Sequence, residues 1–302
     1  MGKVRNIVIQ DMKKILGSST FWLAVVATAL ICFTGSMARD TYGLYNYNIV
    51  DILMDFSVED IKENLDDANV KVIFLKETGS YLWMFAPVLA GMPLIPLLCA
   101  ERKNKAMRYE LVRVGKKRFA LGKLLSSMIS GGMVFMFGYA LFGILLAIIF
   151  PVMGTDKNVI RYIDNIMLYN HPDFIKVYDA IGYVSMIGLK LAGFFVYGAL
   201  SAVFAYIMSS FVTNKYIVLC VPYILNYMLS SFIDKQSMSM SFWELPKWFT
   251  SNFVKLKVNT STQIFQVSWS EIGSYFALHI TLVICSLIIY NIIMSRRCDC
   301  GQ

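Results

Sequence analysis

Residues 125–150 read LSSMISGGMVFMFGYALFGILLAIIF and contain no charged side chain. An α-helix rises about 1.5 Å per residue, so about 18–20 residues cross a hydrocarbon layer of about 30 Å. Charged residues make up only 16% of the 302-residue chain, and they are concentrated between apolar stretches of this kind. A soluble domain of similar length usually carries about 25%. The sequence therefore predicts an all-α integral membrane protein.

Five further stretches share this apolar character, and together they predict six transmembrane helices. The predicted spans are about 21–38, 81–98, 125–150, 183–208, 216–233 and 272–294. The second span contains Pro87, Pro93 and Pro96, which predict a kink or local unwinding because proline lacks the backbone donor that a helix needs. No internal repeat or low-complexity segment divides the chain, so residues 1–302 are interpreted as a single transmembrane domain.

The basic residues predict the orientation of these spans. With the N-terminus inside, the inner segments carry 16 Lys and Arg against four Asp and Glu, whereas the outer segments carry 11 against 16. Cytoplasmic loops of membrane proteins are enriched in Lys and Arg. We therefore expect both termini in the cytoplasm of a multi-pass protein, in a bacterial cytoplasmic membrane. The net charge of +8 follows from this topology and does not indicate nucleic-acid binding.

The segments between the spans are of two kinds. Residues 3–16 read KVRNIVIQDMKKIL, with apolar residues at three- and four-residue spacing, and they predict a basic amphipathic helix over 1–19. Such a helix can lie in the membrane interface, although an ordinary surface helix has the same pattern. The three outer segments are long and are expected to be partly helical; they comprise about 39–80, 151–179 and 234–271.

Signatures of catalysis are missing from the sequence. The chain has two histidines, no Gly-x-Ser-x-Gly nucleophile elbow and no Walker A loop. We therefore expect that this chain is not an enzyme, does not hydrolyse ATP and holds no cofactor. Cys298 and Cys300 form a Cys-x-Cys tail, but two ligands do not fill a tetrahedral metal site, so no metal site is predicted there.

The only large inner loop is the most informative segment. Residues 100–124 read AERKNKAMRYELVRVGKKRFALGKL, and Gly115 is a natural stop for the short helix that precedes it. One face of that helix is mostly apolar and comprises Ala106, Met107, Glu110, Leu111 and Val114. Anchoring by positive charge explains the basic residues but not an amphipathic helix with a defined end. The loop therefore predicts docking of another protein at the membrane surface.

This arrangement resembles the membrane subunit of a type-2 ABC transporter, the ABC-2 permease class. In that family the loop typically runs from an acidic residue through a helix, a Leu or Val, a turn and an arginine to a lysine that enters the third span. Here Glu101, Val114, Gly115, Arg118 and Lys123 occupy those places. The chain departs from the pattern in having Gly115 where many members have proline, and its outer segments are longer than the common minimum.

The resemblance implies a function and a set of partners. The chain would be the permease of an ATP-driven exporter that moves a hydrophobic, peptide-like or drug-like substrate outward. It would pair with a second permease, identical or homologous, and with two ATP-binding subunits that hold ATP and Mg²⁺. Met107 and Leu111 would be buried in a groove of the ATPase. The expected coupling residues are Glu101, Arg102, Met107, Glu110, Leu111, Arg113 and Arg118.

Lys190 is the one charge embedded in a predicted span, within MIGLKLAGFFVYG. A lysine at mid-helix costs about 2.5–3.5 kcal/mol on insertion scales. Its side chain either extends to the outer interface or has a pairing or substrate-pathway role. Two other functions also remain open. A secondary transporter would need ionisable groups within the spans, and a non-transporting sensor or immunity protein would bind its ligand with the outer segments.

Overall fold

In the computed structural model almost all of the described residues are helical, and the predicted all-α class is confirmed. The strands among the described residues are a two-residue antiparallel pair, β1 (Ala38–Arg39) and β2 (Asn46–Tyr47). The Cys298/Cys300 tail and most of the two later outer segments lie outside the described residues. The structure describes residues 2–35, 38–39, 46–55, 70, 73–74, 81–104, 106–150, 172–238, 280–281, 283–290 and 292–293.

The N-terminal region forms two helices, α1 (Gly2–Leu16) and α2 (Ser19–Cys32), whose axes are bent by 71°. The Ser18 hydroxyl accepts a hydrogen bond from the Phe21 N–H and so begins α2 as its N-cap. α2 has only 14 residues, about 21 Å of helix, and it ends well before residue 38. The helix therefore covers only part of the predicted first span at 21–38, and α1 and α2 are long and apolar enough for a span only when they are taken together.

The predicted second span is interrupted, as its prolines led us to expect. It consists of α6 (Leu82–Gly91) and α7 (Ile95–Lys103), with a turn at residues 92–94 between them. Pro93 lies in the turn and Pro96 in the first turn of α7, and neither can donate a backbone hydrogen bond.

The inner loop and the predicted third span form α8 (Ala106–Val114) and α9 (Lys116–Ile149). Gly115 separates them with φ of +92°, a left-handed conformation that favours glycine, so the predicted helix stop is confirmed. α9 has 34 residues and begins inside the loop rather than at residue 125. At about 51 Å it is longer than the hydrocarbon layer is thick.

Three more helical regions complete the described fold. α11 (Pro172–Phe211) changes direction at Gly182, where φ is +73°, and α12 (Lys215–Met238) contains Pro222. A last helical stretch covers residues 283–290. In the first outer segment, the short α3 (Ile49–Asp55) shows that part of this segment is helical.

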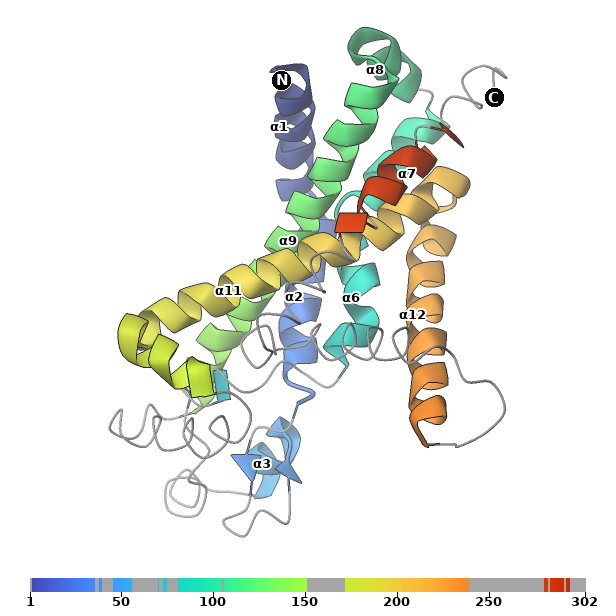
Figure 1. Ribbon diagram of the computed structural model, residues 1–302. Coiled ribbons are helices and arrows are strands. Elements are labelled where there is room, and N and C mark those ends of the chain that lie inside the picture. Colours follow the sequence, from blue (N-terminus) through green and yellow to red (C-terminus); the bar gives the residue numbers. More distant parts are fainter. Residues whose placement is uncertain are drawn as a thin grey trace.

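α9 is the central helix of the bundle, and α1, α2, α6 and α11 all pack against it (Figure 1). The contact between α9 and α11 is very close, because a Cβ atom on Gly198 would lie 2.5 Å from the carbonyl oxygen of Gly131. α12 packs against α6 on the other side of the bundle. Aromatic side chains fill the space between α9 and α11, where the rings of Tyr139 and Phe194 stack 3.9 Å apart.

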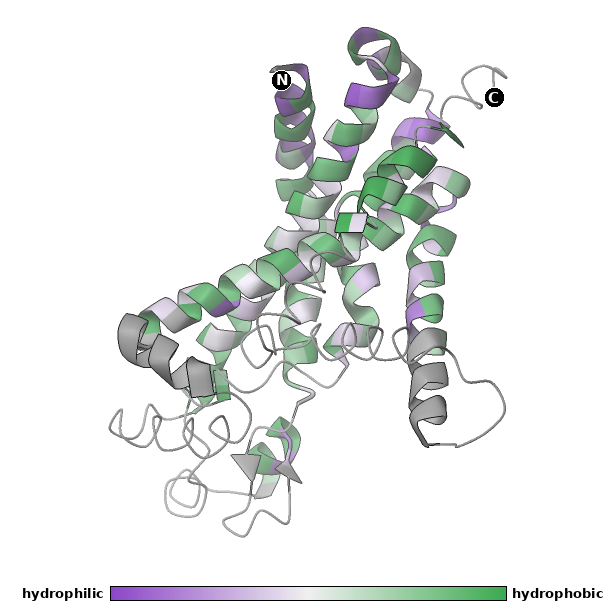
Figure 2. Ribbon diagram, viewed as in Figure 1, coloured by the Kyte–Doolittle hydropathy of each residue, from purple (hydrophilic) through white to green (hydrophobic). Residues whose placement is uncertain are grey.

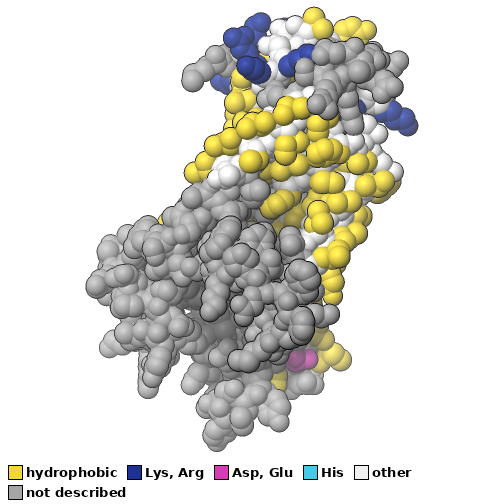
Figure 3. Space-filling model, turned by 45° about the vertical axis from the view of Figure 1, so that its right-hand side comes forward, with side chains coloured by type: hydrophobic (Ala, Val, Ile, Leu, Met, Phe, Trp, Pro, Cys, Tyr) yellow, Lys and Arg dark blue, Asp and Glu magenta, His cyan; other side chains and the backbone are white. Residues whose placement is uncertain are grey.

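Among the described residues, three helices are long and apolar enough to cross a membrane: Leu82–Lys103, Lys116–Ile149 and Ile187–Phe211. The bent pair of α1 and α2 makes a fourth if it is counted as one span. Apolar residues dominate the middle of these helices (Figure 2), and Lys and Arg gather at one end of the face shown in Figure 3. This end carries α8 and the start of α9, and we call it the basic end.

Candidate functional site: a buried ion cluster at the basic end

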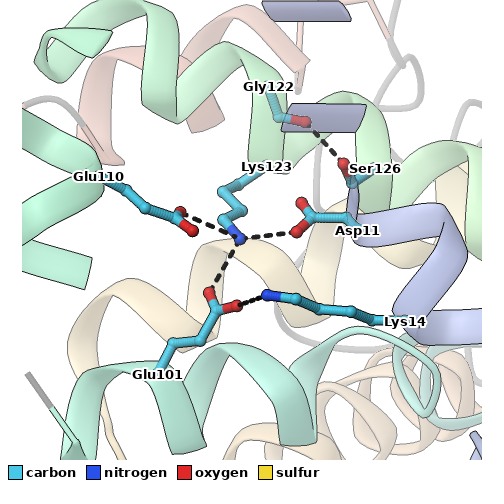
Figure 4. Close-up of polar contacts among 7 residues, drawn as sticks. All are labelled: Asp11, Lys14, Glu101, Glu110, Gly122, Lys123 and Ser126. Atoms are coloured by element: carbon cyan, nitrogen blue, oxygen red, sulfur yellow. Dashed lines mark hydrogen bonds and ion pairs between the residues drawn. The ribbon is translucent and has the colours of Figure 1, made fainter. Parts of the chain in front are cut away.

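Lys123 of α9 is the centre of a buried cluster of charges (Figure 4). Its side chain is wholly buried, and its Nζ atom lies 2.8 Å from Asp11 Oδ1 and 2.8 Å from Glu101 Oε2. Glu110 Oε2 is 3.7 Å from the same Nζ atom. A buried charge is costly unless it is paired, and here the pairs come from three other helices. The Lys123 cluster therefore joins α1, α7, α8 and α9 at one point.

α1 presents Asp11 to this cluster because of its helical spacing. Ile7, Asp11 and Ile15 are four residues apart, and all three are buried. Gly122, next to Lys123, allows Ile7 to approach α9, since a Cβ atom on Gly122 would lie 3.1 Å from the Ile7 side chain. Asp11 thus occupies the middle of the buried face of α1, between two apolar residues that hold it against α9.

The carboxylates of the cluster are unequally satisfied. Glu101 accepts hydrogen bonds on both oxygens, since its Oε1 atom lies 3.0 Å from Nζ of Lys14. By contrast, Oδ2 of Asp11 and Oε2 of Glu110 are buried and accept no hydrogen bond. An ionised oxygen in this position is costly, which makes the cluster sensitive to the loss of its central cation.

Arg102, the residue after Glu101, contacts a different part of the fold. Its guanidinium group donates to the Ser209 carbonyl at the end of α11 and lies 5.9 Å from the centre of the Tyr290 ring. Tyr290 stacks on Tyr206 with ring centres 4.7 Å apart, and the Tyr206 hydroxyl donates to the Ala120 carbonyl. Arg102 therefore links α7 to α11 and to residues 283–290.

α8 uses its apolar face within the chain itself. Met107 and Leu111 are only 4% and 7% exposed and belong to the protein's own core. The expectation that a partner protein buries them is therefore wrong. Gly115 allows α8 to fold back onto α7 and α9, which bury its apolar face without a partner. The opposite face of α8 exposes Tyr109 at 80% and Val112 at 88%.

The structure thus brings some of the predicted coupling residues together and leaves others apart. Glu101 and Glu110 belong to the Lys123 cluster, whereas Arg113 and Arg118 are exposed on the surface of the basic end. The backbone carbonyl of Arg113 accepts a hydrogen bond from Lys3 of α1 at 3.3 Å. The predicted coupling residues did not include three members of the cluster, which are Asp11, Lys14 and Lys123. Lys123 was named only as the lysine that enters the third span.

Lys190 is also buried, with only 3% of its surface exposed. Its Nζ atom donates to the Phe74 carbonyl at 2.9 Å and lies 5.3 Å from the centre of the Tyr139 ring. The Tyr139 hydroxyl donates to the same carbonyl. Lys190 therefore fixes residue 74 of the first outer segment against α9 and α11.

The fold and the cluster define the class of the protein as a helical membrane protein with a buried ionic junction at its basic end. Among the residues that the structure describes, no group of three or more His, Cys, Asp or Glu side chains could hold a metal ion. Comparison of the chain with protein-family models, with curated proteins and with solved structures found no match.

Proposed function

We propose that this chain is the permease subunit of a type-2 ABC exporter in a bacterial cytoplasmic membrane. In this proposal it crosses the membrane six times, with both termini inside, and pairs with a second permease and two ATP-binding subunits. Those subunits bind ATP and Mg²⁺, and the permease moves a hydrophobic, peptide-like or drug-like substrate outward. The basic end is then the cytoplasmic end, in keeping with the enrichment of Lys and Arg in inner loops.

The Lys123 cluster is the observation that carries this proposal. It connects α8, which lies at the basic end of the bundle, to α1, α7 and α9 through ion pairs to a single buried ammonium group. Removing one partner from such a cluster is strongly destabilising, so the four helices are held together as a unit. A protein that pushes on α8 would therefore displace the N-terminal helix and two spanning helices together. An ATP-driven permease requires that movement of its ATPase is passed on to its spanning helices in this way.

The exposed face of α8 supplies the docking surface in this proposal. Tyr109 and Val112 are more exposed than the other large apolar residues at this end, and the exposed basic residues Arg113, Lys117 and Arg118 lie close by in the chain. An apolar pair beside basic residues suits a partner groove with an apolar floor and an acidic rim. Met107 and Leu111 support this surface from behind, because they fix α8 on the bundle.

The test is retention of the ATPase during purification. Replacing Tyr109 and Val112 together with Asp places two charges in the proposed contact, where an unpaired buried charge is very costly. We expect a folded, membrane-inserted permease that has lost its ATPase. The matched control is Lys117→Ala, which removes one exposed side chain and should keep the complex.

Two outcomes distinguish loss of ATPase binding from loss of folding and show whether α8 is the coupling element. The double replacement of Met107 and Leu111 with Asp should abolish folding, rather than only binding, because both side chains belong to the core. If the Tyr109/Val112 variant keeps its ATPase with unchanged stimulated turnover, α8 is not the coupling element and the proposed function fails.

A further inference from the structure

Two consecutive residues at the end of α7 make polar contacts with different helices. Glu101 pairs with Lys123 and Lys14, on α9 and α1. Arg102 donates to Ser209 on α11 and lies over the ring of Tyr290. Neighbouring residues on a helix point about 100° apart, so a single turn of α7 can make both sets of contacts.

α7 is joined to α6 by a break in the helical hydrogen bonds. It is divided from α6 by the turn at residues 92–94, and Pro93 and Pro96 remove two backbone donors around this turn. Backbone hydrogen bonding between the two helices is therefore weaker than in a continuous helix. The other end of α7 is held by the polar contacts of Glu101 and Arg102 and by packing against α8, α11 and α12.

We propose that Glu101 and Arg102, which we call the α7 charge pair, transmit displacement from the Lys123 cluster to the end of α11 and to residues 283–290. Consecutive Cα atoms are about 3.8 Å apart, so Glu101 cannot follow a shift of Lys123 without moving Arg102. Arg102 then carries the shift to the end of α11 and to residues 283–290. Both are positioning residues. Their role in transport rests on the proposed function, but the mechanical link does not.

The link can be tested by hydrogen–deuterium exchange on the full-length protein in lipid nanodiscs. Asp11→Asn weakens the Lys123 cluster on α1, far in sequence from the reporting segments. We expect faster exchange, by about threefold or more, in α1 and also in residues 206–211 and 283–290. In an Arg102→Gln background, Asp11→Asn should still affect α1 but should no longer change exchange in those two segments.

Matched variants separate transmission from a general loss of stability. Lys103→Gln removes an exposed charge from the same turn of α7 and should leave the response to Asp11→Asn intact. Arg102→Lys keeps a cation near Tyr290 and should restore part of the response. If the response to Asp11→Asn is confined to α1, α8 and α9, or persists unchanged in Arg102→Gln, the inference is overturned.

A second measurement addresses the role of the charge pair in transport. Arg102→Gln should retain the ATPase on purification, since Arg102 is not part of the proposed docking surface of Tyr109 and Val112, but substrate export per ATP hydrolysed should fall about tenfold. Normal export by this variant would overturn the transport role of the charge pair. Failure of the unmodified chain to bind any ATPase would instead contradict the proposed function, and the exchange experiment would still decide the mechanical link.

Discussion

Lys123 shows how one side chain can determine the arrangement of a whole region. A lysine is almost never fully buried unless it is paired, and this one is surrounded by three carboxylates. The attraction in such a cluster offsets a large desolvation cost, so its net contribution to stability is modest when it is complete. Removing Lys123 is costly, because Asp11 would then remain buried without a cation and Glu101 would keep only the half-exposed Lys14.

Lys123→Met should accordingly lower the free energy of unfolding by about 3–5 kcal/mol. Methionine keeps most of the volume and removes the charge, so the loss reports on the ion pairs rather than on packing. Thermal or denaturant unfolding in detergent measures it, with exposed Lys117→Met as the control. Adding Asp11→Asn and Glu101→Gln to Lys123→Met should recover part of the loss. A Lys123→Met variant as stable as the control would show that the cluster is not ion-paired.

Lys190 allows a prediction about the transport pathway. Lys190→Met removes the charge and one donor to the Phe74 carbonyl, but the Tyr139 hydroxyl still donates to that carbonyl, so the fold should survive. If Lys190 acts on the pathway, transport into inverted vesicles should fall about tenfold while expression and ATPase binding stay normal. Unimpaired transport by this variant would leave Lys190 with a packing role alone.

Among the helices, the close contact between α9 and α11 depends on the glycines where they meet. Gly198→Ala would place its Cβ atom 2.5 Å from the Gly131 carbonyl oxygen, whereas Gly188→Ala on the same helix meets no atom within 4 Å. We expect the first change to destabilise the protein by about 1–3 kcal/mol through overpacking. The second should be neutral or stabilising by up to about 1 kcal/mol, because alanine favours helix. Unfolding in detergent compares them, and equal stabilities would contradict the close packing.

α8 illustrates what could and could not be predicted from the sequence. Its helical spacing and its end at Gly115 follow from local rules, and both are confirmed. The same spacing shows that something covers Met107 and Leu111, but it does not show what. The spacing is the same whether a partner protein or the chain's own α7 and α9 bury these two side chains. In the structure, α7 and α9 bury them, so the opposite, exposed face of α8 is the face that a partner could bind.

The Lys123 cluster was harder to predict, for a related reason. Asp11 lies between Ile7 and Ile15 in a pattern that is visible in the sequence, and a charge at that position is a signal of burial with a partner. The partner, however, is 112 residues away, and no local pattern specifies a contact across that distance. Composition predicts the spans, and glycine and proline predict the helix ends. Contacts between distant helices depend on how the helices pack, which no local pattern specifies.

At the scale of the whole molecule, charge and apolar surface are separated along the bundle. The exposed basic residues of α1, α8 and the start of α9 lie together at the basic end, and a belt of apolar side chains follows (Figure 3). α3, which belongs to the first outer segment, lies at the opposite end (Figure 1). Lys and Arg are retained on the cytoplasmic side of membrane proteins, so this distribution gives the whole bundle one expected orientation.

Cysteine labelling of intact cells tests that orientation. In a variant without its native cysteines, Met54→Cys on α3 should react with a membrane-impermeant maleimide, because Met54 is 80% exposed and lies on the expected outer side. Lys117→Cys is also exposed, but it should react only after the membrane is permeabilised. Equal accessibility in detergent is the control for both sites. Labelling of Lys117→Cys from outside would reverse the bundle, place α8 beyond the reach of a cytosolic ATPase, and remove the basis for coupling through the Lys123 cluster.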